Sequence, residues 1–100
     1  VIDLPVILHD GTKYIYGTPP FRYEPKEMTF RIGQTVNFTL EFADPNSRHK
    51  HTFSVPGLGI DEKAAYGQSA TFTHTFDKPG VFAIINAAYN PMTGTITVVE

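Results

Sequence analysis

The chain has 100 residues, of which 41% are hydrophobic and 18% charged, and its formal net charge is −2. This composition is typical of one globular domain, which we expect to span residues 1–100, and it gives no electrostatic basis for binding nucleic acid. The absence of cysteine excludes disulfides, zinc–thiolate clusters and thiol catalysis.

Along the chain, apolar residues recur with a period of two, which is the signature of half-buried β-strands. The clearest case is residues 35–42, where Val36, Phe38 and Leu40 share one face and polar residues share the other. Residues 61–66 are the only predicted helical turn, because they begin with two acidic side chains. The predicted strands are residues 5–9, 13–16, 27–32, 35–42, 51–55, 70–76, 81–85 and 95–98.

Turn-forming residues separate these segments at short intervals, for example Asp10-Gly11 and Pro79-Gly80. About eight short strands with frequent turns favour an all-β sandwich or a small barrel. Pattern alone leaves a generic immunoglobulin-like sandwich open as an alternative.

Three motifs in sequence order narrow this choice. Residues 21–36 read FRYEPKEMTFRIGQTV, residues 51–61 read HTFSVPGLGID, and residues 79–100 combine a Pro-Gly turn, a buried strand, a short loop ending in Met92-Thr93-Gly94 and a closing strand. Together they resemble the cupredoxins, the small blue-copper proteins, and most closely the copper domain of cytochrome c oxidase subunit II. The resemblance covers roughly residues 21–100. It implies a Greek-key β-sandwich of cupredoxin type located outside the cytoplasm, whether periplasmic, secreted or membrane-anchored.

The resemblance also assigns the positions of the family's copper ligands. His51 matches the first histidine ligand and Met92 the weak axial ligand, whereas Asn86 and Tyr89 stand where the family has cysteine and a second histidine. A type 1 copper site depends on a copper–thiolate bond, which Asn86 cannot supply. We therefore expect no type 1 copper and no copper-based electron transfer. Our preferred interpretation is that Asn86 and Tyr89 fill the vacated site with side-chain hydrogen bonds.

Another kind of metal site remains open, so the cofactor is either absent or a differently bound copper. His49 and His51 are two residues apart, and on an extended backbone both imidazoles point to one face. With Met92 nearby they could chelate copper or zinc. The adjacent cations Arg48 and Lys50 oppose this, and the sequence indicates no carboxylate partner for either histidine.

The other two histidines carry no predicted chemistry. We expect His9 to lie on the surface without a partner, and His74 to be a strand histidine bonded to the backbone. No phosphate-binding loop, nucleophile elbow or zinc-protease motif occurs, so we do not expect an enzyme.

Three functions are compatible with the sequence. The first is an extracytoplasmic structural or protein-interaction module with an unidentified protein partner, and the second is a metal-handling domain using His49, His51 and Met92. The third is a ligand-binding sandwich with an aromatic surface. The aromatic residues of this third interpretation are Tyr14, Tyr16, Phe21, Tyr23 and Tyr66.

We predict no membrane-spanning segment within these 100 residues. The longest apolar run, residues 81–85, is too short to cross a bilayer. The sequence starts within a strand pattern, so an upstream signal or anchor is compatible with it.

Overall fold

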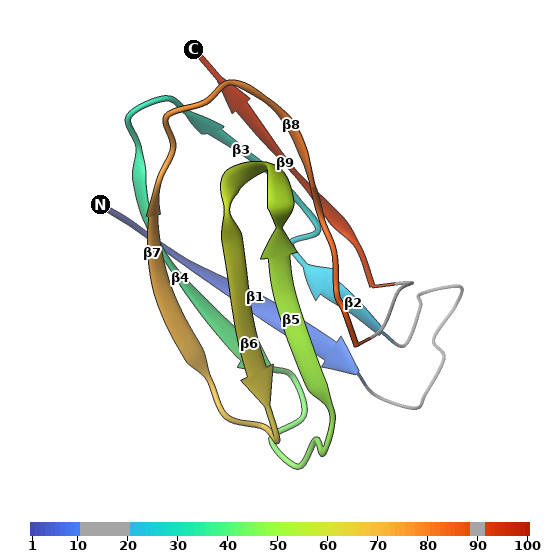
Figure 1. Ribbon diagram of the computed structural model, residues 1–100. Coiled ribbons are helices and arrows are strands. Elements are labelled where there is room, and N and C mark those ends of the chain that lie inside the picture. Colours follow the sequence, from blue (N-terminus) through green and yellow to red (C-terminus); the bar gives the residue numbers. More distant parts are fainter. Residues whose placement is uncertain (11–20, 89–91) are drawn as a thin grey trace.

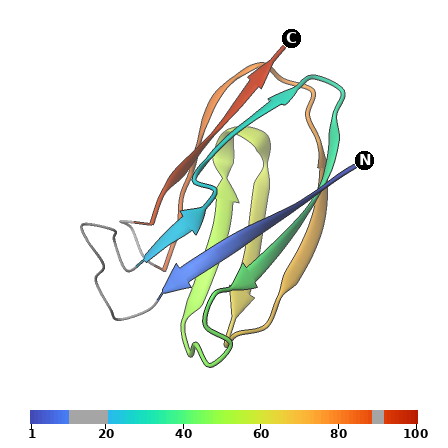
Figure 2. The ribbon, with the colours of Figure 1, turned by 180° about the vertical axis from the view of Figure 1, so that it is seen from behind.

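The computed structural model of the chain describes residues 1–10, 21–88 and 92–100. Its strands form two layers that face each other across an apolar core (Figure 1). The first layer is a four-stranded sheet seen nearest the viewer in Figure 2. Its strands, in spatial order, are β2 (Phe21–Glu24), β1 (Ile2–Asp10), β4 (Thr35–Phe42) and β7 (Ala70–Thr75).

The second layer consists of a three-stranded sheet and a hairpin. The sheet has the order β3 (Glu27–Arg31), β9 (Gly94–Val99) and β8 (Gly80–Ile84), and the hairpin pairs β5 (Lys50–Val55) with β6 (Ile60–Ala65). A single 3-10 turn, η1 (Pro56–Leu58), joins the two hairpin strands. Ser54 and Ile85 connect the hairpin to the sheet through two backbone hydrogen bonds, of 3.1 and 2.8 Å.

Long crossovers give the sandwich its topology. β1 pairs in parallel with β4, and β3 pairs in parallel with β9, whereas β4 and β7 are antiparallel. Such non-sequential pairing is characteristic of a Greek-key arrangement, and the predicted all-β sandwich is confirmed. The alternation predicted for residues 35–42 is also present, because Val36, Phe38 and Leu40 are fully buried.

Aromatic side chains from both layers meet in the core. Phe38 of β4 lies at its centre, stacked on Phe72 at 5.0 Å between ring centroids and tilted against Phe53 at 5.7 Å. Phe30 of β3 stacks on Phe76 at 4.6 Å. Offset and edge-to-face contacts of this kind add to the burial of apolar area. The core therefore ties the hairpin and both sheets together.

The prediction of a helical turn at residues 61–66 is wrong. Residues 61–65 belong to β6, whose Ile60 pairs with Val55 and whose Ala64 pairs with His51, and Tyr66 follows in a turn. Tertiary pairing with β5 and burial of Ile60 and Ala64 outweigh the weak helical preference of the segment. The sequence also did not predict β2, which pairs with β1. The strand predicted at residues 13–16 lies outside the described residues.

Four segments end or begin at the same end of the sandwich (Figure 1). β1 finishes there at Asp10, β5 starts there, β8 leads there and β9 departs from it. The chain termini lie toward the other end. Within the described ranges, no helix has the length and apolar character that crossing a bilayer requires.

Candidate functional site

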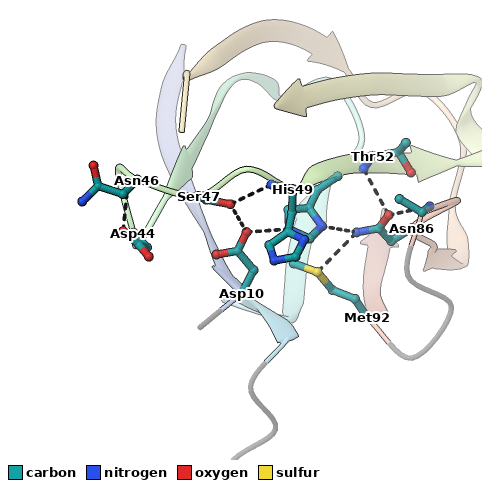
Figure 3. Close-up of polar contacts among 10 residues, drawn as sticks. Asp10, Asp44, Asn46, Ser47, His49, Thr52, Asn86 and Met92 are labelled. Carbon is teal, nitrogen blue, oxygen red and sulfur yellow. Dashed lines mark hydrogen bonds and ion pairs between the residues drawn. The ribbon is translucent and has the colours of Figure 1, made fainter. Parts of the chain in front are cut away.

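His51 is the centre of a buried polar cluster at this end of the sandwich, whose other members Asp10, Asn86 and Met92 are labelled in Figure 3. It lies on β5 with the parity of Phe53 and Val55, so the strand's alternation turns it inward, and its exposed fraction is 1%. Asp10, Asn86 and Met92 reach it from three other segments of the chain. All three are nearly inaccessible to solvent.

One side of the His51 ring faces a carboxylate. His51 Nε2 lies 2.9 Å from Asp10 Oδ2, and the Ser47 hydroxyl donates to the same oxygen. Ser47 Oγ in turn accepts the backbone N–H of His49 at 3.2 Å. Because a carboxylate only accepts, the proton of the His51–Asp10 bond resides on Nε2. The expectation that His51 has no carboxylate partner is therefore wrong.

Asn86 occupies the other side of the ring. Its Nδ2 donates to His51 Nδ1 at 3.0 Å and to Met92 Sδ at 3.3 Å. Its Oδ1 accepts the backbone N–H groups of Thr52 at 3.2 Å and Ala88 at 2.9 Å. The two backbone donors determine which end of the amide is oxygen, so the nitrogen must face His51 and Met92. Both N–H donors and both lone pairs of this buried amide are used.

These bonds define the charge state of the cluster. His51 Nδ1 accepts from Asn86 and Nε2 donates to Asp10, so the imidazole is neutral with its proton on Nε2. Asp10 is the single charged group of the arrangement. Among the residues that the structure describes, its buried Oδ1 has no hydrogen-bond partner, which leaves Ser47 and His51 on Oδ2 to balance the buried charge.

His49 lies beside His51 but in a more open position. The two ring centroids are 6.1 Å apart with an interplanar angle of 40°, and the edge of Phe21 packs on His49 at 5.7 Å. Arg48 and Lys50, on either side of His49 in sequence, are exposed. The structure thus brings His49, His51, Asn86 and Met92 to one end of the sandwich. Tyr89, the other vestigial position, lies outside the described residues.

The donor atoms present do not fit a type 1 copper centre. The chain has no cysteine, and the thiolate position holds the Asn86 amide, a poor copper ligand. Over residues 1–10, 21–88 and 92–100, no three His, Asp or Glu side chains are grouped so as to hold a metal ion. A metal that used His51 Nδ1 together with Met92 Sδ would first have to displace the Asn86 amide, which is hydrogen-bonded to both.

The remaining histidines differ from expectation. His9 has a partner, because its Nε2 lies 2.8 Å from Glu24 Oε1 on the neighbouring strand. His74 Nε2 is buried and has no hydrogen-bond partner within the described residues, so this atom does not make the expected bond to the backbone there. Burial lowers the pKa of His74 below its ordinary value, and the charge of Asp77 opposes this shift.

Tyr23 is a core residue and not part of a surface. Its exposed fraction is 1%, and its hydroxyl donates to the carbonyl oxygens of Thr52 and Ile85. Burial raises the pKa of Tyr23 well above its ordinary value, and Asn86 shifts it in the opposite direction. Of the five aromatic residues proposed as a recognition surface, Tyr66 is the exposed member within the described residues, whereas Phe21 is half-buried and Tyr14 and Tyr16 are not described.

Sequence reasoning missed Asp10 and Ser47. Asp10 stands before a glycine at a strand end, where it reads as a turn residue, and it is distant from His51 in sequence. The only available signal was chemical, because a buried histidine needs partners for both ring nitrogens.

The structure is a two-layer β-sandwich that gathers a histidine, an amide and a thioether at one end, in a chain without cysteine. The sequence profile of the cupredoxin-like domain family matches residues 8–98, and the chain belongs to this family. No curated protein matched the chain.

Solved structures share the fold at low sequence identity. The chain is similar to the metal-binding domain of the Cu(I)-exporting P-type ATPase CopA of Streptococcus pneumoniae D39, with 18% identity and a TM-score of 0.71 over 98% of this chain and 85% of that one. It is also similar to auracyanin of Roseiflexus castenholzii, with 16% identity and a TM-score of 0.71 over 100% and 98%. It is similar, too, to a chain of a heme-copper terminal oxidase, with 22% identity and a TM-score of 0.61 over 75% of this chain. The match covers only about half (51%) of the oxidase chain.

Proposed function

We propose that this chain is a non-catalytic cupredoxin-like module outside the cytoplasm, serving a structural or protein-interaction role, with residues 1–100 as a single domain. The observation that carries the proposal is the position of Asn86 Nδ2, 3.0 Å from His51 Nδ1 and 3.3 Å from Met92 Sδ. These two atoms are the ones the family would use as metal ligands.

The Asn86 amide links His51 and Met92, the two residues that a bound metal ion would otherwise link. It joins β5 to the segment that leads into β9, because its oxygen accepts from Thr52 and Ala88 while its nitrogen donates to His51 and Met92. A buried polar group with all its hydrogen bonds made rigidifies its surroundings. We call Asn86 and its four hydrogen-bond partners His51, Met92, Thr52 and Ala88 the Asn86 latch. This arrangement supports a permanently closed end of the sandwich rather than a redox centre.

A metal-handling function is the second candidate, and two observations favour it. Asp10 holds His51 in the tautomer that directs the Nδ1 lone pair at the Met92 side, which is the carboxylate–histidine arrangement found behind metal ligands. In addition, the CopA domain that shares this fold was solved with Cu(I). Here His51 and Met92, with His49 beside them, would hold a soft ion after the Asn86 side chain had swung away.

Copper titration separates the two candidates. We expect the unaltered chain to give no intense visible charge-transfer band with Cu(II) and to compete poorly for Cu(I) against a chromogenic chelator. Asn86→Ala should bind Cu(I) more tightly than the unaltered chain, because the competing hydrogen bonds are gone, and adding Met92→Leu should reverse the gain. Tight Cu(I) binding by the unaltered chain, lost in His51→Ala, would replace the first candidate with the second.

Restoring the family's residues is a complementary test. Asn86→Cys combined with Tyr89→His supplies the missing thiolate and imidazole, and we expect a visible copper–thiolate band on Cu(II) addition. Asn46→Cys, which places a thiol on the exposed loop before Ser47, is the matched control and should not produce a comparable band.

A further inference from the structure

A turn of unusual composition projects an exposed tyrosine from the hairpin. Gln68 N–H donates to Ala65 O at 3.0 Å, and the two central residues of this turn, Tyr66 and Gly67, have φ angles of +54° and +73°. Glycine, asparagine and aspartate are the usual residues in such a conformation, and a bulky aromatic residue there is a genuine outlier. Tyr66 nevertheless occupies it with 56% of its surface exposed.

Cationic side chains lie on the same part of the surface as this tyrosine. Lys50 Nζ lies 5.7 Å from the centre of the Tyr66 ring, and Lys63 is on the same outward face of the hairpin as Lys50. With Arg48, three of the chain's eight lysine and arginine residues are near this turn, although the chain as a whole is negative. Within residues 1–10, 21–88 and 92–100, no carboxylate forms an ion pair with any of the three.

Two depressions flank the turn. The larger, of about 490 Å³, is lined by both lysines, by small side chains of the hairpin and by the two residues after Asn86. The smaller, of about 370 Å³, lies against Arg48 and the loop before it, with Tyr66 in its wall. The lining of the larger depression includes Lys50, Thr52, Lys63, Ala65, Ala87 and Ala88.

We propose that this surface, the Tyr66 face defined by Arg48, Lys50, Lys63, Tyr66 and the two depressions, docks an acidic segment of a partner protein. Tyrosine and arginine are, with tryptophan, the residues enriched among those that carry most of the binding energy at protein interfaces. The three cations, which form no ion pair within the described part of the chain, select carboxylates, and the alanines between the two lysines accept a small or aliphatic side chain. Backbone strain at an exposed aromatic residue fits a side chain held in place for contact.

The proposal rests on the interaction role proposed above and specifies its surface and partner chemistry. A polyanion such as nucleic acid fits less well, because the cations are few, the overall charge is negative and the floor between them is apolar. The Tyr66 face adjoins the Asn86 latch through Ala87 and Ala88, so a partner bound there would also contact the closed end of the sandwich.

Fluorescence anisotropy with defined probes tests the proposal. The probe is a labelled synthetic peptide of alternating glutamate and leucine, compared with the same peptide carrying lysine for glutamate and with a labelled oligothymidylate. We expect the acidic peptide alone to bind measurably, and the binding to vanish at about 1 M NaCl, where the screening length is about 3 Å. Stronger binding of the oligothymidylate than of the peptide would overturn the assignment to an acidic protein segment.

Matched variants localise the binding. Lys50→Glu with Lys63→Glu should weaken the acidic peptide at least about tenfold, as expected for reversing paired interface charges. Tyr66→Asn should also weaken it while keeping the fold, because asparagine tolerates a positive φ. Lys78→Glu is the control, since Lys78 bonds Gly57 O at the opposite end of the hairpin, and it should bind normally.

The results also distinguish this proposal from the broader one. Equal weakening by Lys78→Glu, or no binding of the acidic peptide by the unaltered chain, overturns the Tyr66 face and leaves the interaction role to another surface. Tight copper binding with an intact peptide response would overturn the closed-site proposal and leave the Tyr66 face standing.

Discussion

Asp10 Oδ2 accepts the Nε2–H of His51 at 2.9 Å, although the two residues belong to different layers of the sandwich. Both side chains are almost completely buried, so the bond is shielded from water. It determines which ring nitrogen of His51 carries the proton and hence which atom faces Asn86. The tautomer of one buried histidine is therefore set by a residue at the end of the first strand.

Replacement of Asp10 tests this relationship. Asp10→Ala leaves the His51 N–H and the Ser47 hydroxyl buried without their acceptor, and we expect a loss of about 1–3 kcal/mol in the free energy of unfolding by urea. The control is Glu24→Ala, which removes the partner of His9 at an exposed site and should cost less than about 1 kcal/mol. Nitrogen NMR of His51 should show the Nε2–H tautomer in the unaltered chain. Equal costs for the two variants, or an Nδ1–H tautomer, would contradict the assignment.

His74 should make stability depend on pH in the acid range. Its pKa is lowered in the folded state, so the unfolded chain takes up a proton first as the pH falls through the ordinary histidine value of about 6.5. The contribution is fully present above that value and is lost below it. We expect urea unfolding to show a smaller loss of stability between neutral and mildly acidic pH in His74→Gln than in the unaltered chain. Parallel profiles for the two proteins would rule out this role of His74.

Tyr23 should make the stability of the fold depend on pH in the alkaline range. Burial raises its pKa, so the unfolded chain ionises first as the pH rises past the ordinary tyrosine value of about 10. Stability is fully present below that value and falls above it. Tyr23→Phe should weaken the alkaline loss, and it should cost about 1 kcal/mol at neutral pH because the hydrogen bonds to Thr52 and Ile85 disappear. Ultraviolet titration should show one fewer late-ionising tyrosine in this variant.

Gly67 has a steric role that Gly33 lacks. Both have positive φ angles, but a Cβ on Gly67 would clash with Pro45 O, whereas a Cβ on Gly33 would meet nothing within 4 Å among the described residues. Gly33→Ala should therefore cost only the backbone strain of about 1–2 kcal/mol. Gly67→Ala should cost about 1–3 kcal/mol more, because the Pro45 backbone must move. Thermal unfolding of the two variants compares them directly, and similar melting temperatures would show that the Pro45 loop yields easily.

The sequence predicted the sandwich well where one face of a strand is buried. The alternation around Phe38 is unambiguous because its period of two is set by the core. β6 was mistaken for a helical turn because its two acidic residues and two alanines have no strand preference of their own. Only pairing with β5 makes this segment a strand, and such pairing is not encoded locally.

At the candidate site, the sequence predicted which residues occupy the family's ligand positions, but it did not predict which distant residues bond to them. The family resemblance identified His51, Asn86 and Met92, and the absence of a thiolate excluded type 1 copper. The carboxylate behind His51 could not be foreseen, because Asp10 reaches it through the pairing of β1 with β4 and the folding of the Ser47 loop across the end of the sandwich. Hydrogen bonds between distant segments depend on the tertiary structure.

The placement of the two chain ends gives the molecule a direction. Both termini lie away from the end that holds His51, and β1 and β9 run between the two ends along their whole length (Figure 1). Any polypeptide attached before Val1 or after Glu100 would therefore leave from the rear of the domain. The exposed Tyr66 turn, and the end of the sandwich that encloses the buried His51 cluster, would then face away from the point of attachment and toward a neighbouring molecule.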